Sequence, residues 1–135
     1  MHAQQLDSGE FQVTRQDLGR VTVLTLAGEL DMATTPLLRE ALDGLDGECS
    51  VVLDVGDLTF LDSNGLHAIF SRAATHDLAL ARPHPNILRL LEVLEGERVL
   101  PIHTTLEAAL EAAGEVPASS RPPLPRSAAR GRPRR

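Results

Sequence analysis

The chain has 135 residues, a formal net charge of −6, one cysteine and no lysine. This length suits a single domain that buries a core without disulfides or a structural metal. Aromatic residues make up only 2% of the chain, which disfavours a protein that stacks single-stranded nucleic acid on aromatic side chains. We therefore expect no direct contact with nucleic acid.

Three further features of the sequence favour the cytoplasm. The single Cys49 cannot form an internal disulfide. No apolar run approaches the roughly 20 residues of a membrane span. The first residues lack the basic stretch followed by an apolar stretch that marks a secretory signal. We expect a cytoplasmic protein that does not contact a membrane.

Charge divides the chain into two parts. All 19 acidic residues lie between Asp7 and Glu115, where only seven Arg occur, a difference of −12. Residues 117–135 hold six Arg, five Pro and no acidic residue. We predict a folded domain over 1–116 and a disordered Pro/Arg-rich tail over 117–135, because such a tail cannot bury enough apolar surface to offset its ordering entropy. The tail could bind acidic lipid or nucleic acid, but a solvated extension is the favoured interpretation.

The hydrophobic pattern predicts alternating strands and helices. In chain order, we first expect strands over 11–15 and 21–27, followed by a helix with an N-cap at Thr35 and Pro36 in its first turn, which ends at Gly44 and Gly47. Next come a strand over 51–55, a helix from Ser63 and a strand over 78–80. The last elements are a helix over 87–94 entered through Pro83 and Pro85, an edge strand over 99–102, and a helix after a capping box at 104–107. Strands joined through helices imply an α/β fold with one mixed, mainly parallel sheet of about five strands and four helices.

Motifs for common cofactors and metals are missing from the sequence. It contains no Gly-rich phosphate loop, no paired-cysteine motif and no His-Glu-x-x-His. The five histidines, which are His2, His67, His76, His84 and His103, lack the spacing of metal ligands. We therefore expect no cofactor and no metal site.

The stretch 58–66, Leu-Thr-Phe-Leu-Asp-Ser-Asn-Gly-Leu, follows a buried strand and begins a helix. Ser63 is therefore expected at or next to the helix N-cap, near free backbone N–H groups and the positive end of the helix dipole. The simplest interpretation is structural, with Ser63 as a cap and Asp62 as a turn residue, because both residue types are ordinary at such positions.

Two functional interpretations compete with the structural one. In the first, Ser63 is a nucleophile with Asp62 or Asp31 and His67 as partners. A nucleophile elbow needs Gly-x-Ser-x-Gly, however, and Leu61 occupies the first glycine position. His67 on the neighbouring turn is also poorly aimed at Ser63. In the second, Ser63 accepts a phosphate, whose charge next to Asp62 would repel an acidic partner.

Several motifs, taken in order, resemble the STAS domain of bacterial anti-sigma factor antagonists. They are 28–31 (Gly-Glu-Leu-Asp), 52–54 (Val-Leu-Asp), 61–66 (Leu-Asp-Ser-Asn-Gly-Leu), the proline-entered helix at 83–91, and the strand at 99–102 with the helix after it. The resemblance covers about residues 11–113.

The resemblance implies a partner-switching protein that is not an enzyme. In such proteins an anti-sigma factor that is a serine kinase phosphorylates the serine after Asp, here Ser63. The unphosphorylated form binds that kinase and releases a sigma factor, and a metal-dependent serine phosphatase resets the switch. The resemblance further implies that Asp31, Asp62, Ser63, Asn64 and Gly65 bind the partner.

Two departures from the family pattern support an alternative. Asn64 stands where the family usually has Ser or Thr, and the connection from the second helix to the third is short, because 73–77 runs almost at once into 78–80. The alternative is a STAS interaction or scaffold module that binds its partner whether or not Ser63 is phosphorylated.

Overall fold

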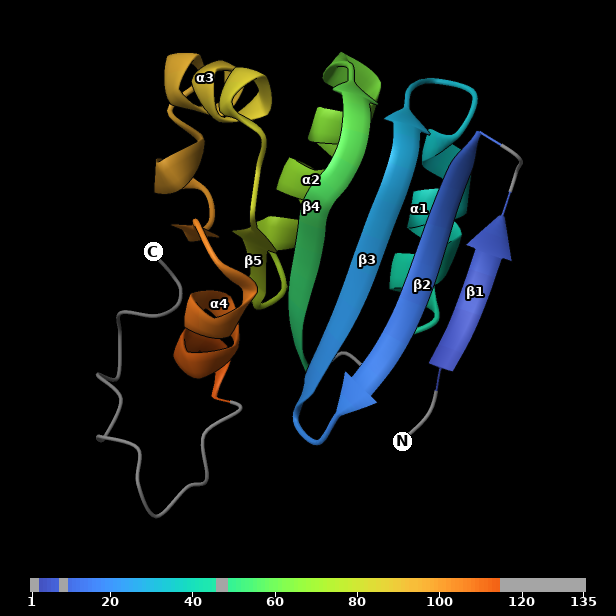
Figure 1. Ribbon diagram of the computed structural model, residues 1–135, viewed down its shortest axis with the longest axis vertical. Helices are drawn as coiled ribbons and strands as arrows, with labels where there is room; N and C mark the ends of the chain where they lie inside the picture. Colours follow the sequence, from blue (N-terminus) through green and yellow to red (C-terminus); the bar gives the residue numbers. More distant parts are fainter. Residues whose placement is uncertain (1–2, 8–9, 46–48, 115–135) are drawn as a thin grey trace.

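The computed structural model describes residues 3–7, 10–45 and 49–114, so the predicted tail 117–135 and Gly47 lie outside the described residues. In these ranges the chain forms one sheet flanked by helices (Figure 1). The elements are β1 (Ala3–Asp7), β2 (Phe11–Leu18), β3 (Val21–Leu30), α1 (Thr35–Asp43), β4 (Ser50–Leu61), α2 (Ser63–Ala73), β5 (Leu78–Ala81), α3 (Pro85–Val93), the 3-10 helix η1 (Gly96–Arg98), β6 (Ile102–His103) and α4 (Leu106–Ala113).

The strand order in the sheet is β1-β2-β3-β4-β5-β6. The first two neighbouring pairs are antiparallel, and the last three are parallel. Each parallel pair is joined by a connection that contains a helix, as crossover connections require. The mixed, mainly parallel sheet with four α-helices confirms the predicted fold class, and β1 adds a strand to the predicted five.

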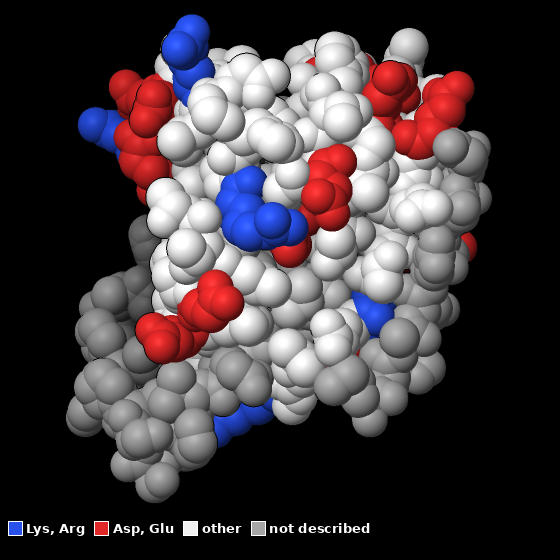
Figure 2. Space-filling model, viewed as in Figure 1, with Lys and Arg blue, Asp and Glu red and all other residues white. Residues whose placement is uncertain are grey.

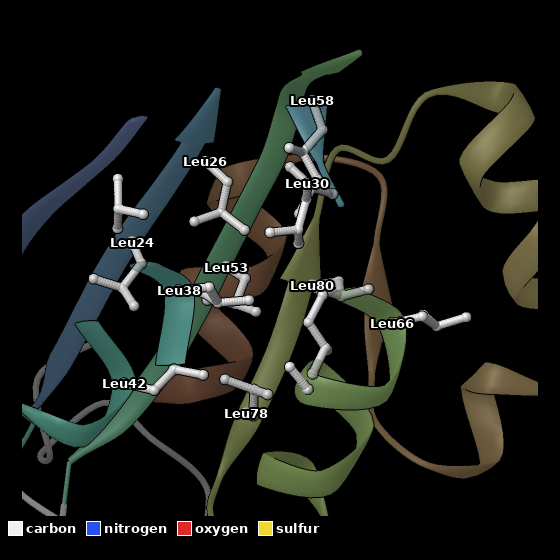
Figure 3. Packing of buried hydrophobic residues seen from close by; sticks show 14 of the residues in the cluster. Leu24, Leu26, Leu30, Leu38, Leu42, Leu53, Leu58, Leu66, Leu78 and Leu80 are labelled. Carbon is white, nitrogen blue, oxygen red and sulfur yellow. The ribbon is translucent and has the colours of Figure 1, made fainter. Parts of the chain in front are cut away.

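Two apolar clusters lie on opposite faces of the sheet. The larger packs α1, α2 and α3 against one face, and Figure 3 shows its leucines converging from strands and helices. The labelled members are Leu24, Leu26, Leu30, Leu38, Leu42, Leu53, Leu58, Leu66, Leu78 and Leu80. The smaller cluster packs α4 against the other face through Ala109, Val21, Val23 and Val52. Alternating residues of β3 and β4 therefore supply both clusters, as the period of a strand dictates.

An ion pair between a buried carboxylate and an exposed arginine lies on the face that carries α4. The carboxylate of Asp54 in β4 is 4% exposed and accepts bonds from Arg82 Nε at 2.9 Å and Arg82 NH2 at 3.1 Å. The backbone N–H of Gly56 also donates to Asp54, at 3.1 Å. The hydrogen bond with Asp54 and the attraction of its charge raise the pKa of Arg82 above its usual value. Figure 2 shows this face, on which acidic side chains gather in several patches.

Several element boundaries differ from the predicted ones. Strand β4 continues to Leu61, because its last residues still pair with the end of β3. The last strand is Ile102–His103 rather than 99–102, because η1 and the turn after it occupy the residues before Pro101. The cap of α1 is Thr34 rather than Thr35, and its side chain makes no cap bond. The cap of α4 is Thr105, which accepts from Ala108, so the predicted box at 104–107 does not form.

Candidate functional site

The site begins where β3 and β4 end side by side. The two strands are parallel, and Leu30 at the end of β3 pairs with Leu61 at the end of β4. The backbone N–H of Asp62 donates to Leu30 O at 3.1 Å, which extends the pairing by one residue. Because both strands end at the same edge of the sheet, the loop before α1 and the start of α2 lie next to each other (Figure 1). The topology thus brings Asp31 and Ser63 to one edge.

Asp31 holds the loop between β3 and α1 in a closed turn. Its carboxylate accepts from the backbone N–H groups of Ala33 at 3.0 Å and Thr34 at 3.1 Å. The buried hydroxyl of Thr34 lies 2.7 Å from Glu29 O and 2.9 Å from the backbone N of Asp31. The hydroxyl of Thr35 donates to Asp31 O at 2.6 Å. These bonds fix the loop, so Asp31 has a structural role within it.

Asp62 is the N-cap of α2, and Ser63 is the first residue of the helix. The Asp62 backbone is extended, and its Oδ1 accepts from the N–H of Gly65 at 3.0 Å. Ser63 lies next to the N-cap, as expected, but the interpretation of Ser63 as the cap and Asp62 as a turn residue is wrong. Aspartate is among the strongest N-caps, and its carboxylate leaves the Ser63 hydroxyl free of that task. The side chain of Ser63 is exposed.

Gly65 is required by the close approach of α2 to β3. A Cβ atom at this position would lie 2.6 Å from Leu30 Cγ and 3.0 Å from Leu61 Cδ1. Both leucines belong to the core or pack against it, so they cannot withdraw without opening a gap. Gly65 therefore lets the first turn of α2 rest directly on the ends of β3 and β4, which positions Ser63. The neighbouring Asn64 is exposed.

Two large apolar side chains are exposed on the elements that end at this edge. Met32 lies next to Asp31 in the loop and is 71% exposed, while Phe60 lies near the end of β4 and is 49% exposed. In the pairing of β3 with β4, Phe60 stands opposite Glu29. The edge therefore combines an exposed hydroxyl, carboxylates and apolar side chains, a mixture typical of protein–protein interfaces.

Sequence reasoning singled out neither Met32 nor Phe60. Simple alternation would place Phe60 on the same face as the buried Leu58. A register shift prevents this, because Gly28 pairs with Leu58 and the next residue, Glu29, pairs with Phe60. Thr59 is the extra residue of this bulge, which turns Phe60 away from the core. A bulge of this kind leaves no mark in the hydrophobic pattern that could have revealed it.

The geometry does not support a nucleophilic role for Ser63. The ring of His67 points along the helix instead, with Nδ1 at 3.4 Å from Ser71 Oγ. The carboxylate of Asp62 accepts from the backbone N–H of Gly65 in α2, and that of Asp31 accepts from the N–H of Ala33 in its own loop. Among the described residues the structure shows no group of three or more His, Cys, Asp or Glu that could hold a metal ion. No helix in this part of the chain is long and apolar enough to cross a membrane.

The chain is similar to proteins of one kind. A family model described as STAS domain matches residues 12–109. An anti-sigma F factor antagonist from Paenibacillus polymyxa is 28% identical over 101 residues, which cover 69% of this chain and 86% of that protein. The crystal structure of an anti-sigma factor antagonist from Mycobacterium paratuberculosis has a TM-score of 0.71 at 24% identity and covers 80% of this chain and 98% of that one. The structure of the antagonist SpoIIAA in its unphosphorylated form has a TM-score of 0.59 at 20% identity, covering 76% of this chain and 96% of that one.

Proposed function

Since the chain belongs to the STAS domain family, as its motifs predict, we propose that it is an anti-sigma factor antagonist switched by phosphorylation of Ser63. In this proposal the unphosphorylated chain binds an anti-sigma factor that is a serine kinase, and binding releases the sigma factor. Phosphorylation of Ser63 ends the binding, and a metal-dependent serine phosphatase restores it. The protein acts by binding and needs no catalytic site of its own.

The observation that carries the proposal is the placement of Ser63. Its side chain is exposed at the first residue of α2, while Asp62 performs the capping. Phosphorylation would therefore cost the helix no cap bond. The first-turn N–H groups and the helix dipole favour a phosphate at this position. This placement supports a reversible switch, because neither state of Ser63 would disturb the cap of α2.

Charge and exposure together give the switch its mechanism. A phosphate adds roughly −1.5 to −2 charges at neutral pH, next to Asp62 and near Asp31. The exposed Met32 and Phe60 supply the apolar contacts of the unphosphorylated complex. A phosphate among them would have to lose its hydration on binding, and it would repel an acidic partner surface. Both effects weaken the complex without any change in the fold.

The proposal is tested by phosphorylation with a cognate anti-sigma kinase, taken from a gene neighbour or from a pull-down. The chain is incubated with the kinase and Mg-ATP, and its intact mass is measured. We expect one added phosphate on the wild type and none on Ser63→Ala. Ser71→Ala is the matched control, because Ser71 is an exposed serine of the same helix, and it should be phosphorylated like the wild type. A phosphate retained by Ser63→Ala would refute the assignment.

Binding variants separate charge from shape. Ser63→Asp adds a negative charge. Ser63→Asn introduces a side chain of nearly the same size as aspartate but without the charge. We expect the affinity for the kinase to fall about tenfold or more for Ser63→Asp and to change far less for Ser63→Asn. Equal losses in the two variants would indicate a steric effect instead of an electrostatic one.

The alternative function is a phosphorylation-independent STAS interaction or scaffold module. Asn64 and the short segment between α2 and β5 favour it, because both depart from the family pattern next to or behind the Ser63 helix. This alternative predicts kinase or partner binding that is indifferent to Ser63→Asp. Binding without phosphorylation, in the presence of Mg-ATP, would support it over the switch.

A further inference from the structure

A small open groove lies between α1 and α2, away from Ser63. Its volume is about 240 Å³, which is below the range of roughly 300–1,000 Å³ typical of drug-sized ligands. The α1 side contributes Arg39 and Asp43, and the far half of α2 contributes Ser71 and Arg72. Thr75 and His76, which follow α2, complete the polar lining. Leu42 and Ala68 also line the groove, so polar and apolar side chains share its surface, and its size suits a small ligand.

The groove carries free positive charge on an acidic protein. Arg72 donates through NH1 to Asp43 at 3.2 Å and through NH2 to Leu42 O at 2.8 Å, which neutralises its charge and joins the two helices. The guanidinium group has five N–H donors, so three remain for a ligand. Arg39 is exposed and forms no ion pair with any residue that the structure describes. The excess charge of the groove is thus that of Arg39.

Neutral side chains that can donate hydrogen bonds line the same groove as Arg39 and Arg72. Thr75 Oγ1 lies 2.7 Å from His76 Nδ1, which leaves the other ring nitrogen of His76 for a ligand. Ser71 contributes a hydroxyl from α2. Donors from two helices and the turn after α2 can approach a ligand from several directions. A phosphate group carries roughly −1.5 to −2 charges at neutral pH and three strong acceptor oxygens, so it can use more of these donors than a singly charged carboxylate can.

From these observations we propose that the groove between α1 and α2 binds a small phosphate-bearing ligand, with Arg39 and Arg72 holding the phosphate. The inference concerns a site separate from Ser63 and stands without the proposed phosphorylation switch. It involves no covalent step. The ligand is bound reversibly by charge and hydrogen bonds.

Inorganic phosphate is the probe that tests the site. The full chain, labelled with nitrogen-15, is titrated with sodium phosphate and, in parallel, with sodium acetate and sodium chloride at matched ionic strength. We expect saturable shifts of the backbone amide signals of residues 39–43 and 71–76 with phosphate. Acetate should be weaker and chloride should give no saturation. Shifts that rise linearly in all three salts, or that fall elsewhere, would overturn the proposal.

Two variants distinguish the groove from general attraction to arginine. Arg39→Gln removes the unpaired charge without removing any described hydrogen bond, and it should weaken phosphate binding about fivefold. Arg89→Gln is the matched control, because Arg89 is an exposed arginine of α3 outside the groove. The affinity of this variant for phosphate should equal that of the wild type. Equal affinities for Arg39→Gln and the wild type would also overturn the proposal. The titration uses no kinase, so its outcome is separate from the test of Ser63.

Discussion

At the start of α2, the neighbouring residues Asp62 and Ser63 have different roles. Asp62 accepts the Gly65 N–H and so begins the helix, while Ser63 remains exposed. This division explains why a residue type that often caps helices is here available for modification. We therefore expect changes at Asp62 to act on stability and, under the proposed function, changes at Ser63 to act on binding.

Replacing the cap should destabilise the protein by a predictable amount. Asp62→Ala removes the acceptor for the Gly65 N–H, and we expect a loss of about 1 kcal/mol in the free energy of unfolding. Asp62→Asn keeps a side-chain oxygen, so its stability should stay within a few tenths of a kcal/mol of the wild type. Urea unfolding of both variants measures the difference. Equal stability of Asp62→Ala and Asp62→Asn would contradict the capping role.

His103 makes the stability of the fold sensitive to acid. Burial lowers the pKa of His103 from its ordinary value of 6.5, and its Nε2 has no hydrogen-bond partner among the described residues. The unfolded chain therefore binds a proton more readily than the folded chain. The resulting contribution to stability is present above pH 6.5 and is lost as the pH falls through the lower, folded pKa.

Urea unfolding at about pH 7.5 and about pH 5.5 tests this dependence. The wild type should lose more stability on acidification than His103→Gln, which cannot titrate. His84→Gln replaces an exposed histidine and should behave like the wild type. If His103→Gln lost as much stability as the wild type, the titration of another group would be responsible.

At the scale of elements, the contact of α2 with the end of β3 positions the candidate site. Gly65→Ala would place a methyl group against Leu30, and we expect a destabilisation of about 1–3 kcal/mol from this overpacking. Leu30→Ala makes room and should reduce the penalty. A double-mutant cycle of unfolding free energies measures the coupling between the two positions. Additive effects would show that the methyl group is accommodated elsewhere.

How far the sequence predicts each element depends on what terminates it. The predicted helix from Ser63 begins at that residue, and the predicted strand over 78–80 is one residue longer in the structure. The helix predicted over 87–94 begins two residues earlier, at Pro85, where proline is a local signal for a first helical turn. The length of β4 was not predicted, because its last residues remain in the sheet only by pairing with β3. Tertiary pairing of this kind overrides local propensity.

Some features of the candidate site could be predicted from the sequence, and others could not. The resemblance implies that Asp31 and Ser63 belong to one partner-binding site, and the structure places both at the edge where β3 and β4 end. Their roles as partner-binding residues, with Asn64 and Gly65, stay predictions. The exposure of Phe60 could not be predicted, because the bulge at Thr59 arises from the register of two strands and not from either strand alone.

For the whole molecule, the predicted boundary after residue 116 has a direct test. The described sheet and helices lie within residues 3–114, so removal of 117–135 should leave the free energy of unfolding and its urea dependence nearly unchanged. Comparison of the full chain with the shortened chain by urea unfolding measures both. A clear loss of stability on removal would show that the Arg-rich segment contributes to the fold.

The sheet also has a property that concerns its synthesis. Its spatial order, β1-β2-β3-β4-β5-β6, repeats the order of the strands along the chain. Each strand that leaves the ribosome therefore finds its neighbour already made, and no late strand has to insert between two earlier ones. Domains made in this way can assemble progressively from the N-terminus, and the last helix, α4, covers its face of the sheet when the strands beneath it are complete.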